Sequence, residues 1–311
     1  YRTTPGDLSS VSTIQDPKTL KLTTTNFPVF SAGNTYQCIL STAYTMIEAL
    51  KFTATGFGNA LISLQAIGCS ATLCSATQTS DTAGSRCFQA TTASGCAFIN
   101  CEAYHLGTGT NSTSTYLSSV SGTTFYGCYG FCALTGSTAG VFKLDSHPCP
   151  IVNCVIVSTG CCGIYLNSTV PYHLIANNTI IVPIGQNSIT LASVAATYAP
   201  IIVNNMLTDS ARAWDNLNHA TSHRPVLRVG NRTRDNANAD RGADDWPIVG
   251  AITTDTGGQS SDFIDAAGGT DYRLAPGSPA LTGSILGGGG VGSLDPPSGS
   301  TATRLVGRNP R

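Results

Sequence analysis

The sequence predicts an all-β solenoid, in which successive turns of extended chain stack into a column. Two observations predict this fold: a short motif recurs at a nearly constant spacing, and its residues favour strands. Each copy is two apolar residues followed by two small polar ones, and the last residues of successive copies lie 27, 26, 24 and 27 positions apart. Self-similarity at a period of about 20–50 residues is typical of stacked repeats. The five copies cover residues 98–101, 125–128, 151–154, 175–178 and 202–205.

The residue types indicate strands rather than helices. The copies are rich in Ile, Val, Phe, Tyr and Thr, which favour a pleated backbone, and they lack the i, i+3, i+4 spacing of an amphipathic helix. A second set of apolar segments falls between the copies, so each coil has at least two strands separated by Gly/Ser/Thr corners. Stacked strands would pair about 4.8 Å apart, as in a parallel β-helix. This second set covers residues 86–88, 116–117, 141–144, 163–166 and 188–191.

Two segments resemble a known family. Residues 177–180 and 204–207 each contain an asparagine pair followed by a strand-like dipeptide, and residues 271–280 read D-Y-R-L-A-P-G-S-P-A. The first pattern resembles the corners of the pectate-lyase-like superfamily, and the second is similar to the closing segment of many secreted and phage-borne β-helix proteins. The coil resemblance covers roughly residues 40–210 and implies a single-stranded, right-handed parallel β-helix. It implies no chemistry, because this fold carries many functions.

Charge divides the chain into regions. The formal net charge is −1 and only 11% of residues are charged, well below the usual quarter. From Leu207 onward there are ten Arg and eleven Asp, whereas residues 53–206 hold five charged side chains. We therefore expect a lead-in or cap over residues 1–40, β-helix coils over 41–207, and the last coils with an irregular, charged cap or docking region over 208–311. The five charged side chains are Asp81, Arg86, Glu102, Lys143 and Asp145.

Cysteines recur at the period of the repeat. All twelve lie between Cys38 and Cys162, and four of them, spaced 27, 27 and 26 apart, should stack one above another: Cys74, Cys101, Cys128 and Cys154. This spacing suits either disulfides or a ladder of free thiols that fills the core. Asn178 and Asn205 take the same place in later copies, which favours an inward or corner ladder. The even count and the scarcity of Lys and Glu predict an extracellular setting with some disulfides.

Four carboxylates are weak catalytic candidates. Hydrolysis of a glycoside needs two carboxylates at a set separation, and lyase chemistry needs a base with charge stabilisation. Glu102 lies near His105 in the sequence and Asp145 near His147, but their phases differ, and we interpret them as isolated surface or corner residues. The remaining candidates are Asp244 and Asp245.

The Asp244-Asp245-Trp246 segment resembles the paired-aspartate element of the polygalacturonase branch only superficially, because the other elements of that branch are absent. We favour a salt-linked loop that docks the tail on the last coils. Asp271 and Arg273 are expected to have the same role, bridging a turn.

Other ligand classes have little support. Residues 235–240 are a candidate Ca²⁺ site through Asp and Asn oxygens, but their spacing matches no EF-hand loop, and no other cofactor or metal is expected. The coils lack basic residues with interleaved aromatics, which argues against nucleic acid. No apolar run reaches the 18–20 residues of a membrane span.

The leading hypothesis is a non-enzymatic structural or adhesive β-helix, extracellular, on a cell surface or on a virion. Its Ser/Thr/Asn surface would bind a cell-surface or environmental polysaccharide, with aromatic side chains as contacts if they point outward. One alternative is a polysaccharide lyase or glycoside hydrolase of tailspike or secreted type. Another is a self-assembling filament or capsid-decoration component, and self-association or a larger assembly is expected. The aromatic candidates are Tyr116, Tyr126, Tyr165 and Trp246.

Overall fold

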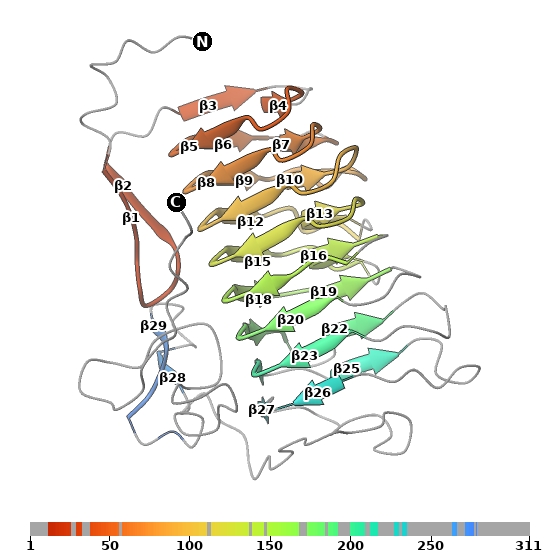
Figure 1. Cartoon of the computed structure of the whole chain (residues 1–311). Helices are drawn as coiled ribbons and strands as arrows, with labels where there is room; N and C mark the ends of the chain where they lie inside the picture. The colour runs from red at the N-terminus through yellow and green to blue at the C-terminus, as the bar shows by residue number, and fades with distance from the viewer. Residues whose placement is uncertain are drawn as a thin grey trace.

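The chain folds into a parallel β-helix flanked by two small hairpins (Figure 1). The computed structural model describes residues 12–25, 29–32, 38–55, 58–110, 113–136, 139–145, 148–167, 173–183, 186–191, 200–208, 212–216, 227–229, 232–234, 263–265, 271–276 and 278. Within these ranges the regular elements are all strands, and no helix there is long and apolar enough to cross a membrane.

Three parallel sheets form the column, and each coil contributes one strand to each sheet. Sheet 1 consists of β4 (Cys38–Leu40), β7 (Ala60–Leu64), β10 (Arg86–Ala90), β13 (Ser114–Ser118), β16 (Gly140–Leu144), β19 (Cys162–Leu166), β22 (Asn187–Leu191) and β25 (Arg212–Asn216). Sheet 2 consists of β5 (Met46–Glu48), β8 (Ser70–Thr72), β11 (Ala97–Ile99), β14 (Thr124–Tyr126), β17 (Ile151–Val152), β20 (Leu174–Ala176), β23 (Ile201–Val203) and β26 (Leu227–Val229). Sheet 3 consists of β3 (Val29–Ala32), β6 (Lys51–Ala54), β9 (Ser75–Gln78), β12 (Glu102–His105), β15 (Tyr129–Cys132), β18 (Val155–Ser158), β21 (Thr179–Ile181), β24 (Met206–Thr208) and β27 (Arg232–Arg234).

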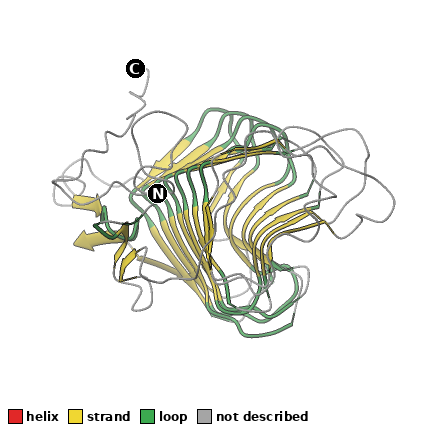
Figure 2. Cartoon of the chain, turned by 90° about the horizontal axis from the view of Figure 1, so that it is seen from below, coloured by secondary structure: helices red, strands yellow, loops and turns green. Residues whose placement is uncertain are grey.

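The repeat copies occupy the same place in successive coils, as the periodicity predicts. Phe98 pairs with Phe125, and Phe125 pairs with Ile151 on the next coil. Viewed along the column, the strands of each sheet lie one behind another (Figure 2). The coils begin earlier than the predicted residue 41, since β3 and β4 already pair with strands of the next coil. The repeat motif is hard to recognise in the sequence of the first coil, because Tyr44 and Ala49 occupy its left-handed corners in place of Asn or Gly.

The third position of each copy is a corner between sheets 2 and 3. Its backbone is left-handed, with φ of 51° at Asn100, 64° at Gly127 and 57° at Asn153. Glycine and asparagine adopt this conformation at the lowest cost, which explains why the motif has one or the other there. The corner N–H groups donate to the next coil, for example from Asn100 to the Tyr126 carbonyl at 2.8 Å.

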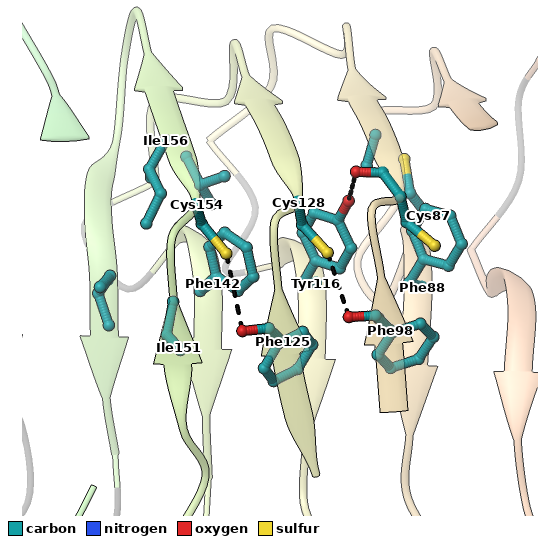
Figure 3. Close-up of a cluster of buried hydrophobic side chains, with 14 of the residues drawn as sticks. Cys87, Phe88, Phe98, Tyr116, Phe125, Cys128, Phe142, Ile151, Cys154 and Ile156 are labelled. Carbon is teal, nitrogen blue, oxygen red and sulfur yellow. Dashed lines mark hydrogen bonds between the residues drawn. The ribbon is translucent and has the colours of Figure 1, made fainter. Parts of the chain in front are cut away.

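Stacked aromatic rings fill the centre of the column (Figure 3). The ring of Tyr116 lies 5.1 Å from that of Phe88 and 4.5 Å from that of Phe142, with interplanar angles of 7° and 5°. Tyr116 is fully buried, and its hydroxyl donates to the Tyr129 carbonyl at 2.9 Å. The prediction that Tyr116 contacts a glycan is therefore wrong, because a core carbonyl satisfies its hydroxyl and the ring never reaches the surface.

The fourth position of each copy is an internal ladder of thiols and amides. Cys128 Sγ donates to the Phe98 carbonyl at 3.3 Å (Figure 3), and Asn178 Nδ2 donates to the equivalent Ile151 carbonyl at 2.9 Å. Thiol and amide thus use the same acceptor one coil back, which confirms the predicted inward ladder. All twelve cysteines are free, so the expected disulfides are not formed. The ladder members are Cys74, Cys101, Cys128, Cys154, Asn178 and Asn205, all buried.

Two antiparallel hairpins lie together on one side of the column (Figure 1 and Figure 2). They are β1 (Ser12–Gln15) with β2 (Leu22–Thr25), and β28 (Phe263–Asp265) with β29 (Asp271–Leu274). Leu20 and Tyr272 form a second apolar cluster with Tyr129 and Val155, on the outer face of sheet 3. The described part of the tail therefore docks on β15 and β18, in the middle of the column. The loop at residues 244–246, predicted to dock on the last coils, lies outside the described residues.

Candidate functional site

Lys143, Asp145 and Tyr165 gather on the outer face of sheet 1. Lys143 points outward from β16 because its neighbours Phe142 and Leu144 face the core. Tyr165 on β19 is its register partner on the next coil. The Lys143 Nζ lies 5.7 Å from the centre of the Tyr165 ring and 3.8 Å from Asp145 Oδ1. Two of the sequence candidates, Asp145 and Tyr165, are thus brought together.

Two further polar groups complete this site. Ser119 Oγ and Asn167 Nδ2 each donate to Asp145, both at 3.4 Å. We call these five residues the Lys143 cluster. The side chains of Lys143 and Asp145 are 17% and 28% exposed, so both reach solvent. Burial, followed by the nearby Cys162 and Asp145, raises the pKa of Tyr165, and its phenol is therefore neutral at ordinary pH.

The cluster belongs to a longer stripe along sheet 1. Gln89 Nε2 donates to Ser63 Oγ at 3.0 Å, and Arg86 donates to Gln89 Oε1 at 3.0 Å. Sequence reasoning missed these polar residues, although Gln89 occupies the same phase as Lys143. The stripe consists of Ser63, Gln89, Leu117, Lys143, Tyr165 and Thr190, which are register partners on successive coils.

Glu102 and His105 do not form a pair. They are three residues apart on β12, and alternate residues of a strand point to opposite faces. Glu102 faces outward beneath the β1–β2 hairpin, where it accepts the Leu22 N–H at 3.2 Å and the Tyr104 hydroxyl. Burial raises the pKa of Glu102, against the opposing effect of these two hydrogen bonds. The carboxylate is an anchor for the hairpin.

His105 instead meets Ser85 in a buried corner. Its Nε2 lies 2.9 Å from Ser85 Oγ, and Ser85 donates its own hydroxyl proton to the Ser80 carbonyl at 3.2 Å. Burial lowers the pKa of His105 to about 4, so the imidazole is neutral at ordinary pH. A serine nucleophile directs its proton at the imidazole, whereas the Ser85 hydroxyl also has the Ser80 carbonyl within hydrogen-bond distance. No sequence signal links the two, because they lie on different coils.

Among the described residues, the remaining candidates do not form another cluster of functional side chains. Tyr126 is half-buried on the outer face of β14. Among the residues that the structure describes, no three His, Cys, Asp or Glu side chains are arranged to hold a metal ion. The candidates outside the described residues are Asp244, Asp245, Trp246, His147 and the 235–240 segment.

The Lys143 cluster presents one cation and one carboxylate to solvent, whereas Tyr165 is only 5% exposed and places its ring against Lys143. A single carboxylate does not provide the two-carboxylate geometry of glycoside hydrolysis. The groups are suited to exchanging hydrogen bonds with hydroxyls, since they include both donors and acceptors. Comparison with protein-family models and with curated proteins finds no match for this chain.

Proposed function

We propose that this chain is a non-enzymatic structural column, extracellular or on a virion surface, with an adhesive face at the Lys143 cluster. The observation that carries the proposal is the use of the same internal contacts in coil after coil. Aromatic stacks, the thiol–amide ladder and the left-handed corners all continue from one coil to the next. Each coil is then stabilised mainly by its neighbours, as in other solenoids.

The described carboxylates support a structural role. Glu102 holds the β1–β2 hairpin, and Asp271 binds Arg273 on the same strand, with a closest approach of 2.7 Å. Asp145 differs from these two: its side chain reaches solvent, and it lies beside Lys143, which contacts the Tyr165 ring. This placement favours recognition of a hydroxyl-rich polymer over cleavage of one.

Binding is tested by titrating the whole chain with neutral and acidic polysaccharides. We expect Lys143→Ala and Asp145→Asn to weaken binding by about tenfold each, the loss of roughly one charge-assisted hydrogen bond. Lys18→Ala is the matched control, because Lys18 is exposed on the hairpin turn, away from sheet 1. Equal losses of polysaccharide affinity in all three variants would show that the binding site does not lie on sheet 1.

Catalysis is tested separately. The same polysaccharides are incubated with the chain and assayed for new reducing ends and for 4,5-unsaturated products. We expect neither product. If either accumulates, the chain is an enzyme, and the double variant Asp244→Asn/Asp245→Asn then shows whether the paired aspartates carry the reaction.

A further inference from the structure

The thiol part of the internal ladder is an unbroken row of sulfur atoms on four successive coils. The residue that follows each cysteine is the register partner of the residue that follows the next one, so the four cysteines lie one coil apart. Side-chain hydrogen bonds join each thiol to the next, and all four side chains are 0% exposed. We call these four residues the thiol row: Cys74, Cys101, Cys128 and Cys154.

The spacing of the thiol row matches the bonds of a bridging metal ion. Cys101 and Cys128 point the same way, since each Sγ lies 3.3 Å from the equivalent carbonyl, that of Ala71 or Phe98. Strands of neighbouring coils lie about 4.8 Å apart, and a metal–thiolate bond is about 2.3 Å long. An ion midway between two stacked sulfur atoms therefore forms two bonds of ordinary length in a straight line. Each pair of neighbouring thiols is a preformed two-ligand site.

The surroundings of the row decide which cations it suits. Apolar core side chains flank it (Figure 3), and among the described residues no three His, Cys, Asp or Glu side chains are arranged around one ion. A cation that needs four such ligands, as structural Zn²⁺ does, finds only two in the row. Thiolates favour soft cations. A divalent cation between two thiolates is neutral, whereas a monovalent one leaves a negative charge in an apolar core, which is costly.

The ends of the row fix how its thiols pair. Leu50 lies one coil before Cys74, and Asn178 lies one coil after Cys154. Neither side chain is a ligand for a soft cation, so an end thiol can pair only with its neighbour inside the row. Four thiolates neutralise two divalent ions, and both ions fit only if the first two thiols form one pair and the last two form the other.

We propose that the thiol row binds soft divalent cations that take two ligands in a line, such as Hg²⁺, one between Cys74 and Cys101 and one between Cys128 and Cys154. Each ion replaces two thiol protons, which pass to water, and forms two sulfur–metal bonds. Each ion also joins two neighbouring coils covalently through its ligands. This internal site is independent of the adhesive face proposed on sheet 1.

Native mass spectrometry of the whole, reduced chain tests the proposal. The chain is equilibrated with mercuric chloride and a small monothiol until the spectrum no longer changes. An ion held by a single protein thiol keeps the small thiol as its second ligand. An ion held in the row instead adds one mercury atom, removes two hydrogen atoms and excludes the small thiol. We expect ions of this second kind. A chain that carries only mixed complexes with the small thiol, or no mercury, overturns the proposal.

Substitutions assign the ions to the row. Cys154→Asn breaks the second pair but keeps the ladder contact, and we expect it to bind one dithiolate-held ion fewer than wild type. Adding Cys101→Ala breaks the first pair, so the double variant should bind two fewer. Cys149→Ala is the matched control, because Cys149 is also buried but its Sγ donates to Ser118 Oγ. Far-ultraviolet circular dichroism checks that each variant is folded. An unchanged count in Cys154→Asn, or an equal loss in the control, shows that the ions lie outside the thiol row.

Discussion

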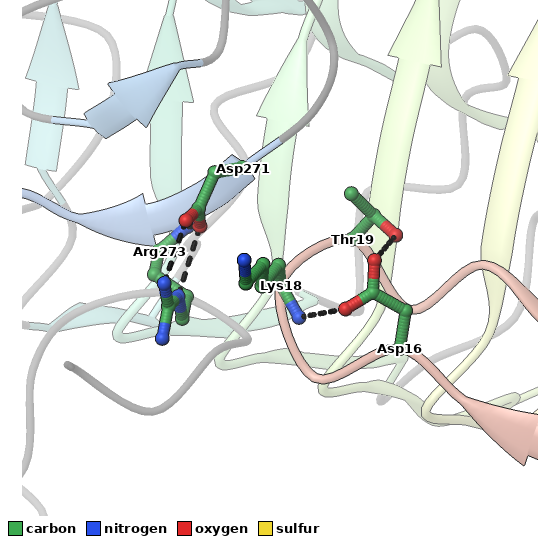
Figure 4. Close-up of polar contacts among 5 residues, drawn as sticks. All are labelled: Asp16, Lys18, Thr19, Asp271 and Arg273. Atoms are coloured by element: carbon green, nitrogen blue, oxygen red, sulfur yellow. Dashed lines mark hydrogen bonds and ion pairs between the residues drawn. The ribbon is translucent and has the colours of Figure 1, made fainter. Parts of the chain in front are cut away.

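The backbone N–H of Tyr272 donates to the carbonyl of Lys18 at 2.8 Å, which joins segments from near opposite ends of the chain. The contact lies beside the bidentate Asp271–Arg273 pair and the Asp16–Thr19 turn (Figure 4). The two hairpins therefore form one unit, which we call the terminal clasp: β1, β2, β28, β29 and the turn between β1 and β2. The clasp is fastened to the coils through the second apolar cluster.

Loss of the Tyr272 ring should loosen the clasp. Tyr272 is 4% exposed and packs in the cluster with Leu20 and Tyr129. We expect Tyr272→Ala to cost about 3–4 kcal/mol of local stability, as for other buried aromatic truncations. Hydrogen exchange should speed up in β1 and β2 but not in β14 or β17. Tyr272→Phe keeps the ring and is the control, and unchanged exchange in β1 and β2 would show that the ring does not hold the hairpin.

Acid should increase the stability of the fold at Glu102, because protonation removes a buried negative charge. Because burial raises its pKa above the ordinary 4.5, the folded chain binds this proton more tightly than the unfolded chain. Its contribution to stability is therefore greatest below 4.5 and falls as pH rises through the elevated pKa. Glu102→Gln should remove this dependence. The difference in melting temperature between wild type and variant, followed from pH 4 to 8, measures it, and a constant difference would contradict the shift.

The thiol–amide ladder predicts that two substitutions differ in their cost to stability. Asn178 Oδ1 accepts the buried Cys154 N–H at 2.8 Å, so Asn178→Ala should cost about 1–3 kcal/mol through an unpaired donor. Cys154→Asn extends the amide ladder by one coil, since Cys154 Sγ already faces the Phe125 carbonyl (Figure 3). We expect that variant to lie within about 1 kcal/mol of wild type. Chemical denaturation compares them, and equal destabilisation would refute the shared-acceptor interpretation.

Gly130 leaves room for the central rings. A Cβ at this position would lie 2.5 Å from Val141 Cγ1 and 3.2 Å from Tyr116 Cε2. Gly130→Ala should therefore destabilise the chain by about 1–3 kcal/mol through overpacking. The double variant Gly130→Ala/Val141→Ala relieves the closest clash. Denaturation midpoints should show the double variant losing less than the sum of the two single changes, and simple additivity would count against the clash.

The sequence predicts the column but not every strand in it. Phe98, Phe125 and Ile151 share a core position, and the recurrence of large apolar side chains makes that position visible. In sheet 3 the sequence indicates the strands that follow the asparagine pairs, β21 and β24. It does not indicate earlier ones such as Glu102–His105, which lacks a run of Ile or Val. Tyr116 was a glycan-binding candidate on the condition that it points outward, and composition does not reveal that internal carbonyls can satisfy its phenol.

The site was predictable only in part. Asp145 and Tyr165 were candidates, but their partnership with Lys143 depends on the register between β16 and β19. The Ser85–His105 contact and the terminal clasp join segments on different coils or at opposite ends of the chain, and one sequence carries no signal for such pairs. The alternation rule does separate Glu102 from His105, since an odd spacing places them on opposite faces.

The terminal clasp also sets how the molecule would respond to pulling. Tension applied between β2 and β29 meets the Lys18–Tyr272 contact first, so the load bypasses the stacked coils. The coils carry no load until that contact ruptures, and only then does further extension unfold them one by one. The clasp thus protects the coils from forces below its own rupture force.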